Sequence, residues 1–303
     1  MRCLVTGAGG FLGQHLVRHL VAAGHQVIAL DRQGEGVVPG AINLACDIDD
    51  GAALKAGVAA GRPELVFHLA AQSFPGRSWD EPAETCHTNV LGTVHLLEAV
   101  RASAPSARVV VAGSSSEYAP SADPISEDAP VLPSSPYAVS KLATDQVTHL
   151  YAQRYQLAAM RVRPFFLLGP GKTGDVSSDL ARGIVAIEQG RAADLAVGNL
   201  DAVRDFLDCR DGVAAFIAVA ERGAPGTAYN ISSGRGHAVR ALLDLFKAEA
   251  RVPVVERVDA ARLRPLDEPV KIGDNRRLRA LGWAPQIGLA QSVRDILEYW
   301  RCK

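Results

Sequence analysis

The sequence lacks three patterns that would place it in other classes of protein. Its five cysteines are widely spaced and form no CxxC pair, so neither a zinc or other metal site nor a redox dithiol is expected. No run approaches the ~18 uninterrupted apolar residues that span a membrane. Lysine and arginine form no basic cluster, so we expect no nucleic-acid partner.

What is present is the composition of an ordinary globular protein. Of the 303 residues, 48% are hydrophobic and 21% are charged, and 32 basic side chains nearly balance 33 acidic ones. A chain of this length buries a sizeable core, in one large domain or two modest ones. It opens on the apolar run MRCLVTG without a charged leader, which makes the cytoplasm the expected compartment.

Short apolar runs alternate with amphipathic stretches through the first half of the chain. The runs predict strands at 3–6, 26–30, 65–69, 108–112 and 158–162, and helical spacing predicts helices at 11–23, 89–102 and 137–155. The unbroken apolar strands are typical of a parallel sheet covered on both faces. This alternation predicts an α/β fold with a doubly wound parallel sheet, the Rossmann architecture.

The sequence changes in character after about Gly169. The loop-like GPGKTGD is followed by helical stretches at 180–189 and 239–249, and a segment rich in proline, arginine and aspartate follows at 263–274. We expect residues 1–168 to form the first domain. Residues 169–303 should form mainly a smaller α/β lobe over the open edge of the sheet, with part of this later chain returning to the first domain.

A glycine motif, GxxGxxG, stands between the first strand and the first helix. Gly7 permits a tight turn, Gly10 lets a pyrophosphate approach the backbone, and Gly13 lets the helix pack closely on the strand. The helix N-terminus offers free N–H groups and the positive end of a dipole to phosphates. Together with Asp31 at the end of the second strand, this unit predicts a site for a nicotinamide dinucleotide.

Two acidic positions bear on the cofactor. Asp31 is placed to accept from the ribose hydroxyls and favours NAD, while Arg32 beside it leaves NADP open by offering a guanidinium to a 2′-phosphate. Asp47 and Ile48 follow a third strand, where an acid would meet the adenine ring. The alternative for Asp47 is a cap on the helix that starts near Asp50.

A tyrosine and a lysine one helical turn apart form the candidate catalytic pair. Tyr137 and Lys141 lie in YAVSK, on one face of a helix that opens after Pro136. A phenol has a pKa near ~10, which a neighbouring ammonium lowers, so Tyr137 could exchange a proton with a sugar hydroxyl or ketone during hydride transfer. Ser114, in the serine run after the strand at 108–112, would hold the substrate oxygen.

Further motifs extend along the chain: TGAGGFLG at 6–13, HLAAQS at 68–73, TNVLGT at 88–93, GSSSEY at 113–118, SPYAVSK at 135–141, RPF at 163–165 and RDFLDCRD at 204–211. Together they resemble the extended short-chain dehydrogenase/reductases of the nucleotide-sugar epimerase/dehydratase family, over essentially the whole chain. The resemblance implies an NAD or NADP cofactor. It also implies that several residues join the glycines, Tyr137 and Lys141 in binding it: Phe11, Leu12, Leu69, Ala70 and Ala71.

The resemblance implies a nucleotide-sugar substrate and a set of contacts to it. These are Ser73, Ser115, Ser116, Arg163, Asp179, Arg204, Arg264 and Asp267. Arg204 and Arg264 would hold the diphosphate through charge-assisted bonds, and Asp267 would accept from ribose hydroxyls. Salt bridges within the lobe are the alternative for each. Asp179 and Glu188 resemble residues near the base.

The resemblance also bears on assembly. In this family the helices corresponding to 89–102 and 137–155 pair across a two-fold axis as a four-helix bundle, so a homodimer is expected. Ordinary packing on the sheet also accounts for much of the apolar content of these two helices.

Other segments resemble the reductases that convert GDP-4-keto-6-deoxy-D-mannose to GDP-D-rhamnose: SWDEP at 78–82, VGNLDAVRDFLD at 197–208 and RLRPLDEPVKIGD at 262–274. These segments are also similar to GDP-mannose 4,6-dehydratases. Alignment on Glu117, Tyr118 and Ala119 puts Ser116 where the dehydratases carry a glutamate, so the carboxylate for elimination is missing.

We therefore expect NAD(P)H-dependent reduction of the keto group of a GDP-4-keto-6-deoxy-hexose. The alternatives are a nucleotide-sugar 4-epimerase, a 4,6-dehydratase and a non-catalytic dinucleotide-binding regulator. One departure from the family is Phe166, which stands where the motif RPFN carries an asparagine that touches the substrate phosphates.

Overall fold

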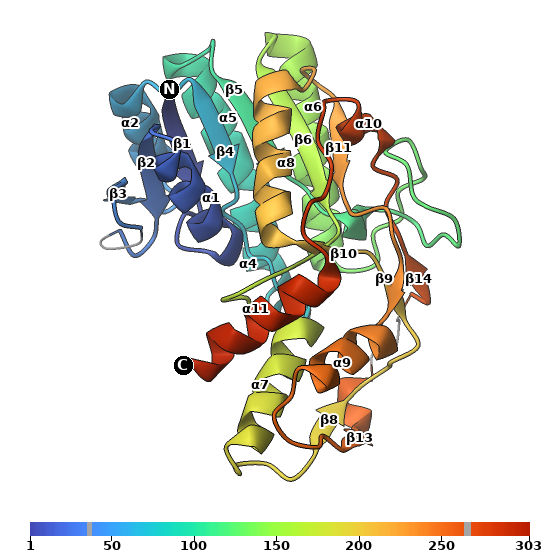
Figure 1. Ribbon diagram of the computed structural model, residues 1–303. Helices are drawn as coiled ribbons and strands as arrows, with labels where there is room; N and C mark the ends of the chain where they lie inside the picture. Colours follow the sequence, from blue (N-terminus) through green and yellow to red (C-terminus); the bar gives the residue numbers. More distant parts are fainter. Residues whose placement is uncertain (35–37, 264–267) are drawn as a thin grey trace.

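The computed structural model describes residues 1–34, 38–263 and 268–303. Its main body is a parallel sheet of seven strands in the order β3-β2-β1-β4-β5-β6-β11 (Figure 1). The strands are β1 (Arg2–Thr6), β2 (Gln26–Asp31), β3 (Ile42–Ala45), β4 (Leu65–His68), β5 (Arg108–Ala112), β6 (Ala158–Pro164) and β11 (Ala228–Ile231). All neighbouring pairs run parallel, which confirms the doubly wound α/β fold.

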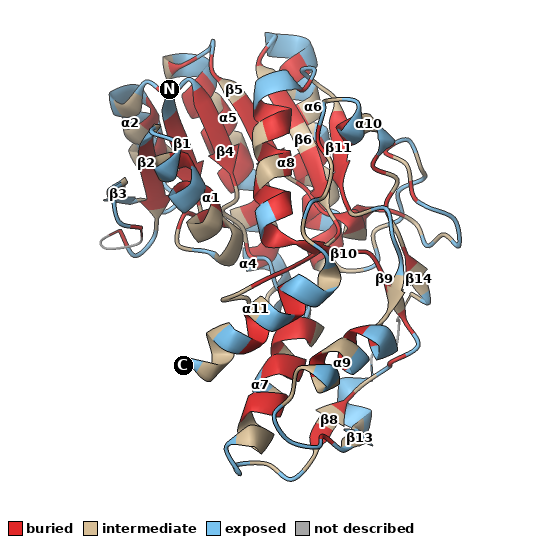
Figure 2. Ribbon diagram, in the orientation of Figure 1, coloured by how far each residue is buried: buried red, intermediate tan, exposed pale blue. Residues whose placement is uncertain are grey.

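Helices cover both faces of this sheet. One face carries α1 (Phe11–Ala22) and α8 (Cys209–Arg222), and the other carries α2 (Gly51–Gly61), α5 (Gly92–Ser103) and α6 (Pro136–Tyr155). Successive strand residues point to opposite faces, so Val5 packs in one core with Leu16 and Leu4 packs in the other with Leu97. The buried strands form the centre of the body in Figure 2.

The segment between β4 and α5 is more broken than its sequence predicts. Two short helices, α3 (Arg77–Asp80) and α4 (Pro82–Cys86), lead into a π-helical turn, η1 (His87–Leu91). The helix expected at 89–102 therefore begins as a π turn, and its regular part starts only at Gly92. Single π turns of this kind are often found at functional sites.

The later chain forms a second, smaller body. Its helices are α7 (Val176–Glu188), α9 (Val239–Ala248) and α11 (Leu289–Arg301), which pack around a core of their own. Its short strands are β7 (Phe166–Leu168), β8 (Leu195–Val197), β9 (Val203–Arg204), β10 (Phe206–Asp208), β12 (His237–Ala238), β13 (Glu256–Val258) and β14 (Val270–Lys271). The short helix η3 (Ala260–Arg262) also belongs to it, whereas α10 (Arg276–Arg279) packs beside β11 of the sheet body.

The lobe lies at the carboxyl ends of the parallel strands, below the sheet in Figure 1, rather than over the open edge as expected. Part of the later chain does return, because α8 covers the sheet and β11 pairs with β6 as an edge strand. Loops at the carboxyl ends of parallel strands diverge and leave a crevice for ligands. The lobe therefore lies on the side of the sheet where such a crevice is expected.

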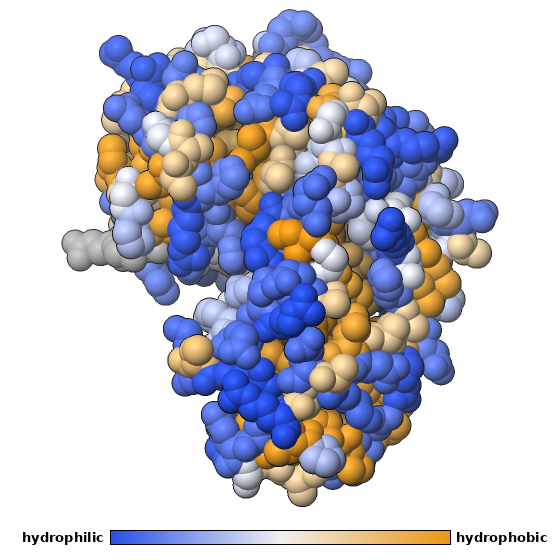
Figure 3. Space-filling model, in the orientation of Figure 1, coloured by the Kyte–Doolittle hydropathy of each residue, from blue (hydrophilic) through white to orange (hydrophobic). Residues whose placement is uncertain are grey.

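In Figure 3 the outline is indented where the sheet body meets the lower lobe, and hydrophilic side chains cover much of the surface in this view. Among the helices of the described residues, none is both long and apolar enough to cross a membrane.

Candidate active site

The glycine loop between β1 and α1 is tightly enclosed by backbone. Gly7 has a φ of 68°, and a Cβ atom there would lie 2.6 Å from the Ala70 nitrogen. A Cβ atom on Gly13 would lie 2.1 Å from the Gly7 carbonyl oxygen. Gly10 caps α1 without a side chain that takes up the N–H groups of the first turn, which leaves them to an anion. These features fit a dinucleotide pyrophosphate.

The end of β2 comes directly against this loop. Asp31 accepts the Gly9 N–H at 3.0 Å, and Arg32 beside it is exposed. Gly9 was not among the expected site residues, although the sequence GAGG predicts a loop with only one small side chain. A Cβ atom there would lie 3.0 Å from the Asp31 carboxylate, so the two residues are in close contact at the place where the sequence predicts a ribose.

The third strand leads to Asp47 and Ile48. Asp50 is the residue that caps α2, accepting from the N–H groups of Ala52 and Ala53. The alternative in which Asp47 caps this helix is therefore wrong; its carboxylate instead accepts the Asp49 N–H at 3.1 Å. Ile48 is buried against Gly92, so its side chain supports α5, and contact with a cofactor would have to come from its backbone.

The three candidate catalytic residues meet beyond the end of β5. Ser114 stands in extended conformation before the 3-10 helix η2 (Ser115–Glu117), and its hydroxyl accepts the Ser116 N–H at 3.1 Å. Tyr137 opens α6 after Pro136 at the first helical position, and Ser114 acts on its phenol electrostatically. Lys141 follows one turn later and donates to the Ala112 carbonyl at 2.8 Å. The elements therefore bring the three expected residues to one corner.

The electrostatics of this corner differ from expectation. Burial raises the pKa of Tyr137 to about 12, against the smaller lowering effect of Ser114. Burial lowers the pKa of Lys141 to about 8, while the nearby charge of Glu117 raises it. The expectation that the lysine lowers the tyrosine pKa does not hold for the chain alone, because burial dominates. The phenol is therefore protonated at neutral pH.

A buried hydrogen-bond network attaches α6 to the loop after β4. Asn89, in the π turn, accepts the Gln72 N–H at 2.7 Å and donates to Ser140 at 2.8 Å. The Ser140 hydroxyl donates in turn to the Tyr137 carbonyl at 2.7 Å. Gln72 and Asn89 lie within the motifs HLAAQS and TNVLGT, but no role was expected of them. Their position next to Tyr137 makes them supports of the catalytic helix.

Leu69 and Ala70 border the glycine loop, and Leu69 donates its N–H to the Thr6 carbonyl at 3.2 Å. Ala71 and the exposed Ser73 follow in the same loop. Phe11 and Leu12 open α1 beside it. These expected cofactor and substrate residues therefore gather at the carboxyl ends of β1 and β4.

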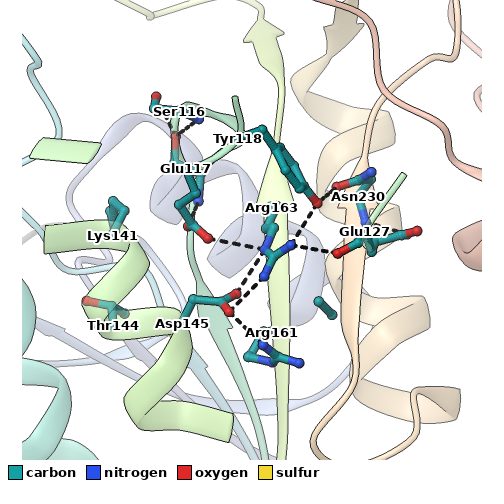
Figure 4. Close-up of polar contacts among 12 residues, drawn as sticks. Ser116, Glu117, Tyr118, Glu127, Lys141, Thr144, Asp145, Arg161, Arg163 and Asn230 are labelled. Carbon is teal, nitrogen blue, oxygen red and sulfur yellow. Dashed lines mark hydrogen bonds and ion pairs between the residues drawn. The ribbon is translucent and has the colours of Figure 1, made fainter. Parts of the chain in front are cut away.

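Arg163 lies inside a buried cluster of charges (Figure 4). Its Nε and Nη2 donate to the two oxygens of Asp145 at 3.0 and 2.8 Å. Its Nη1 donates to the Tyr118 hydroxyl and the Glu127 carbonyl, and Nε lies 3.2 Å from Glu117 Oε2. With 3% of its surface exposed, it does not fit the expected role of a substrate contact, because its donors already face buried partners.

The lobe contains a cavity of about 390 Å³, which its own residues line. Phe166, Asp179 and Arg204 line it, and the Arg204 guanidinium lies 5.4 Å from the centre of the Phe166 ring. Asp179 accepts from Arg262, which also lines the cavity, at 2.9 Å. The cavity thus has cations and apolar walls of the kind that hold a nucleoside diphosphate.

Other expected lobe residues lie elsewhere. Glu188 pairs with Arg301 of α11 at 2.6 Å and is almost buried, so it stabilises the lobe as a salt bridge, as the alternative predicts. Arg264 and Asp267 lie outside the described residues. Ser115 is buried within η2, whereas Ser116 is half buried and contacts the Ser114 hydroxyl at 2.9 Å.

Comparisons with known proteins agree with this arrangement. The NAD dependent epimerase/dehydratase family matches residues 3–232. GDP-6-deoxy-D-mannose reductase of Pseudomonas aeruginosa is 35% identical, over 100% of this chain and 98% of the relative. UDP-glucose 4-epimerase of Mycolicibacterium smegmatis is 33% identical, over 100% and 99%.

Among solved structures, the chain is similar to RMD from Pseudomonas aeruginosa complexed with NADPH. The TM-score is 0.89 at 32% identity, and the match covers 100% of this chain and 99% of the other. The chain is thus similar over its full length to a GDP-sugar reductase and to a UDP-sugar epimerase. The chain belongs to the NAD dependent epimerase/dehydratase family.

Proposed function

We propose that this protein is an NAD(P)H-dependent reductase that converts the 4-keto group of a GDP-4-keto-6-deoxy-hexose to a hydroxyl. The full-length similarity to GDP-6-deoxy-D-mannose reductase supports the substrate class. In the same proposal, residues 1–168 bind the dinucleotide and residues 169–303 mainly bind the nucleotide sugar. The cavity beside Arg204 lies in the second part.

The chemistry follows from the catalytic corner. When bound, NAD(P)H supplies a hydride for C4. The hydroxyls of Ser114 and Tyr137 hold the ketone oxygen, and Tyr137 gives its proton to that oxygen as negative charge develops there. Because burial raises the pKa of Tyr137 to about 12, the phenol is in the acid form that the reductive direction requires. Lys141 places its ammonium nearby, at the end of β5.

The side chains that follow Ser114 are the observation that favours a reductase activity over a 4,6-dehydratase activity. A dehydratase needs a carboxylate that reaches the sugar to remove water. Ser116 stands at that position and contacts the Ser114 hydroxyl. Glu117 is 0% exposed and its Oε1 accepts the Ser114 N–H at 2.7 Å, so this carboxylate faces the protein interior rather than a substrate.

Two incubations test the proposal. With GDP-4-keto-6-deoxy-mannose and NADPH or NADH, we expect loss of reduced-nicotinamide absorbance in step with a product two hydrogen atoms heavier. With GDP-mannose and NAD alone, mass spectrometry should find no loss of water. A dehydrated product would overturn the reductase. UDP- and dTDP-linked 4-keto sugars serve as controls for the nucleotide, and cofactor that is not consumed would indicate an epimerase instead.

The same proposal includes a homodimer through a four-helix bundle of α5 and α6. The two helices are in contact, and Val139 and Leu150 of α6 are 49% and 57% exposed although apolar. Leu150→Glu should convert a dimer to a monomer in light scattering, whereas Gln153→Glu, an exposed neighbour on α6, should not. A wild-type monomer would contradict this part. The five free thiols agree with a reducing compartment such as the cytoplasm.

A further inference from the structure

His68 ends β4 and takes no part in the chemistry derived above. All eight histidines lie in the described residues, and His68 is the only buried one, with 3% of its surface exposed. Its Nδ1 lies 2.7 Å from the Thr6 hydroxyl at the end of β1, and its Nε2 lies 3.1 Å from the Thr93 hydroxyl of α5. Both threonines are buried as well. The imidazole therefore joins β1 to α5 through two buried hydrogen bonds.

The direction of these hydrogen bonds follows from the number of protons available. The Thr93 hydroxyl donates its single proton to the Asn89 carbonyl at 2.7 Å, so it accepts from His68 at Nε2. A neutral imidazole has one N–H donor and one acceptor nitrogen, so Nδ1 accepts from the Thr6 hydroxyl. Burial lowers the pKa of His68 to about 3, which keeps the ring neutral at neutral pH. The surroundings thus select the tautomer with its proton on Nε2.

The Thr6 side of this connection ends at the glycine loop. Thr6 directly precedes Gly7, and its hydroxyl oxygen accepts the Ala70 N–H at 3.4 Å. A Cβ atom on Gly7 would lie 2.6 Å from that same nitrogen, so Ala70 forms one wall of the loop. His68 therefore holds, through Thr6, the backbone whose features fit the cofactor pyrophosphate.

The Thr93 side of the connection ends at the catalytic helix. The Asn89 carbonyl that accepts from Thr93 also accepts from Thr144 of α6 at 3.0 Å. The Asn89 amide donates to Ser140 of the same helix at 2.8 Å, and the Ser140 hydroxyl donates to the Tyr137 carbonyl. Buried polar networks whose members all have partners are rigid. Thr93 is thus connected to the backbone that carries the catalytic tyrosine.

We propose that His68 is a positioning residue that holds the glycine loop and the catalytic helix α6 at a fixed separation, by accepting from Thr6 and donating to Thr93. This role rests on the proposed function, because reduction brings a hydride from the nicotinamide and a proton from Tyr137 to one carbonyl group. The cofactor is held from one side of this connection and the phenol from the other. A shift of either by about 1 Å can cost about 100-fold in rate.

The first test is spectroscopic and does not need catalytic activity. Nitrogen-15 NMR distinguishes protonated from unprotonated ring nitrogens, and His68→Gln identifies the pair of signals that belongs to His68. If this variant does not fold, Thr93→Val identifies the same pair, because it removes the acceptor of the Nε2 proton. In the wild type we expect a protonated Nε2 and an unprotonated Nδ1 throughout about pH 5 to 8, the range in which an ordinary histidine titrates. A proton on Nδ1, or a titration within this range, would overturn the proposal.

The second test separates the Thr93 hydroxyl from the shape of its side chain. Thr93→Val keeps the shape but can no longer accept from His68, whereas Thr93→Ser keeps the hydroxyl and loses a methyl group. We expect kcat for the 4-keto sugar to fall about 10-fold in Thr93→Val and to be largely retained in Thr93→Ser. An equal loss in both variants would show that Thr93 acts by packing. That result, or an unchanged kcat in Thr93→Val, would contradict the proposal.

A double variant tests the ring between the two threonines. Thr6→Val and Thr93→Val interrupt the same connection on opposite sides of His68, so the double variant should lose about as much kcat as one single variant. Losses that multiply, to about 100-fold, would mean that the two threonines act independently, which rules out a role for His68 between them.

Thr148→Val is the matched control for these substitutions. Thr148 is buried in α6, and its hydroxyl donates within that helix to the Thr144 carbonyl at 2.8 Å. We expect this variant to keep the wild-type kcat. A loss as large as that in Thr93→Val would show that any missing buried hydroxyl near the site slows the reaction, and the assignment of His68 would fall.

The last measurement separates this proposal from the proposed function. Thr6→Val should weaken NAD(P)H binding about fivefold, the effect of one hydrogen bond, because the wall of the glycine loop loses its contact with the Thr6 hydroxyl. Fluorescence titration measures the dissociation constant, with Thr148→Val again as the control. If the wild type reduces no 4-keto sugar, the proposed function fails while the tautomer and the cofactor affinity still decide the role of His68. Unchanged affinity in Thr6→Val would show that His68 does not hold the loop.

Discussion

The catalytic corner and the lobe cavity place their polar side chains in opposite environments. At the corner, Ser114, Tyr137 and Lys141 are all at most 9% exposed, and hydrogen bonds within the sheet body fix the side chains of Ser114 and Lys141. In the cavity wall, Asp179 and Arg262 are each more than two-fifths exposed. Buried polar groups are costly to move, whereas exposed ion pairs contribute little. Under the proposed function, the chemistry belongs to the part whose polar groups are buried, and substrate choice to the part whose ion pairs are exposed.

The sharpest test of this contrast is removal of one buried hydroxyl. Tyr137→Phe should lower kcat by about 100- to 10,000-fold, because the ketone oxygen loses its proton donor, while NAD(P)H affinity stays near that of the wild type. Steady-state kinetics and cofactor fluorescence measure the two quantities. Tyr155→Phe, on the exposed last turn of the same helix, is the control and should be neutral. Near-normal turnover in Tyr137→Phe would remove Tyr137 from the mechanism.

The glycine loop extends the rigid part to the cofactor. Gly13→Ala places a methyl group 2.1 Å from the Gly7 carbonyl oxygen, which only a shift of backbone can relieve. Overpacking of this kind costs about 1–3 kcal/mol, so we expect NAD(P)H affinity, measured by titration calorimetry, to fall roughly 10- to 100-fold. Gly76→Ala meets no atom within 4 Å and should bind the cofactor normally. Unchanged cofactor affinity in Gly13→Ala would show that the loop accommodates a Cβ atom at position 13 without moving the cofactor site.

The same contrast explains how far sequence reasoning reached. In the sheet body, hydrophobic periodicity and glycine spacing are visible in short stretches of sequence. They were enough to predict the sheet, the helices α1 and α6, and the three candidate catalytic residues. Arg163 was misplaced, because a buried ion pair with Asp145 depends on contacts between β6 and α6 that spacing does not reveal. Glu117 entered the sequence analysis only as an alignment position, although Ser114 and Glu117 match the S-x-x-E spacing of a capping box.

The lobe was harder to predict for a physical reason. Its strands are two or three residues long, too short for hydrophobic alternation to define them. Its position at the carboxyl ends of the sheet follows from the path of the chain after β6, which no local pattern contains. Phe166 illustrates this: the sequence shows only that an asparagine is missing, while the structure places its ring against Arg204 and Phe206.

In the lobe, a conservative change should act on substrate binding alone. Arg204→Lys keeps the charge but loses the planar fork that matches a phosphate and stacks on Phe166. We expect KM for the GDP-sugar to rise about 10-fold, the equivalent of one charge-assisted hydrogen bond, with kcat nearly unchanged. Arg191→Lys, on the exposed end of the lobe, is the matched control. A fall in kcat without a change in KM would show that Arg204 acts in the catalytic step. It would contradict the assignment of catalysis to the corner and of substrate binding to the lobe.

The smallest expected effect is at Asp31, which lies between the two extremes because it is partly exposed at the end of β2. Asp31→Ala removes the acceptor for the ribose hydroxyls and for the Gly9 N–H, so NADH affinity should fall several-fold, the effect of about 1 kcal/mol from one hydrogen bond. NADPH affinity should fall less or rise, because a carboxylate no longer repels the 2′-phosphate while Arg32 remains beside it. The ratio of the two dissociation constants is therefore the quantity to measure.

Asp31→Asn keeps an oxygen that can accept the Gly9 N–H but removes the charge, so it separates the two contributions. If the carboxylate repels the 2′-phosphate, this variant should gain NADPH affinity while the glycine loop keeps its hydrogen bond. Equal losses for both cofactors in both variants would show that Asp31 supports the glycine loop and does not distinguish the ribose.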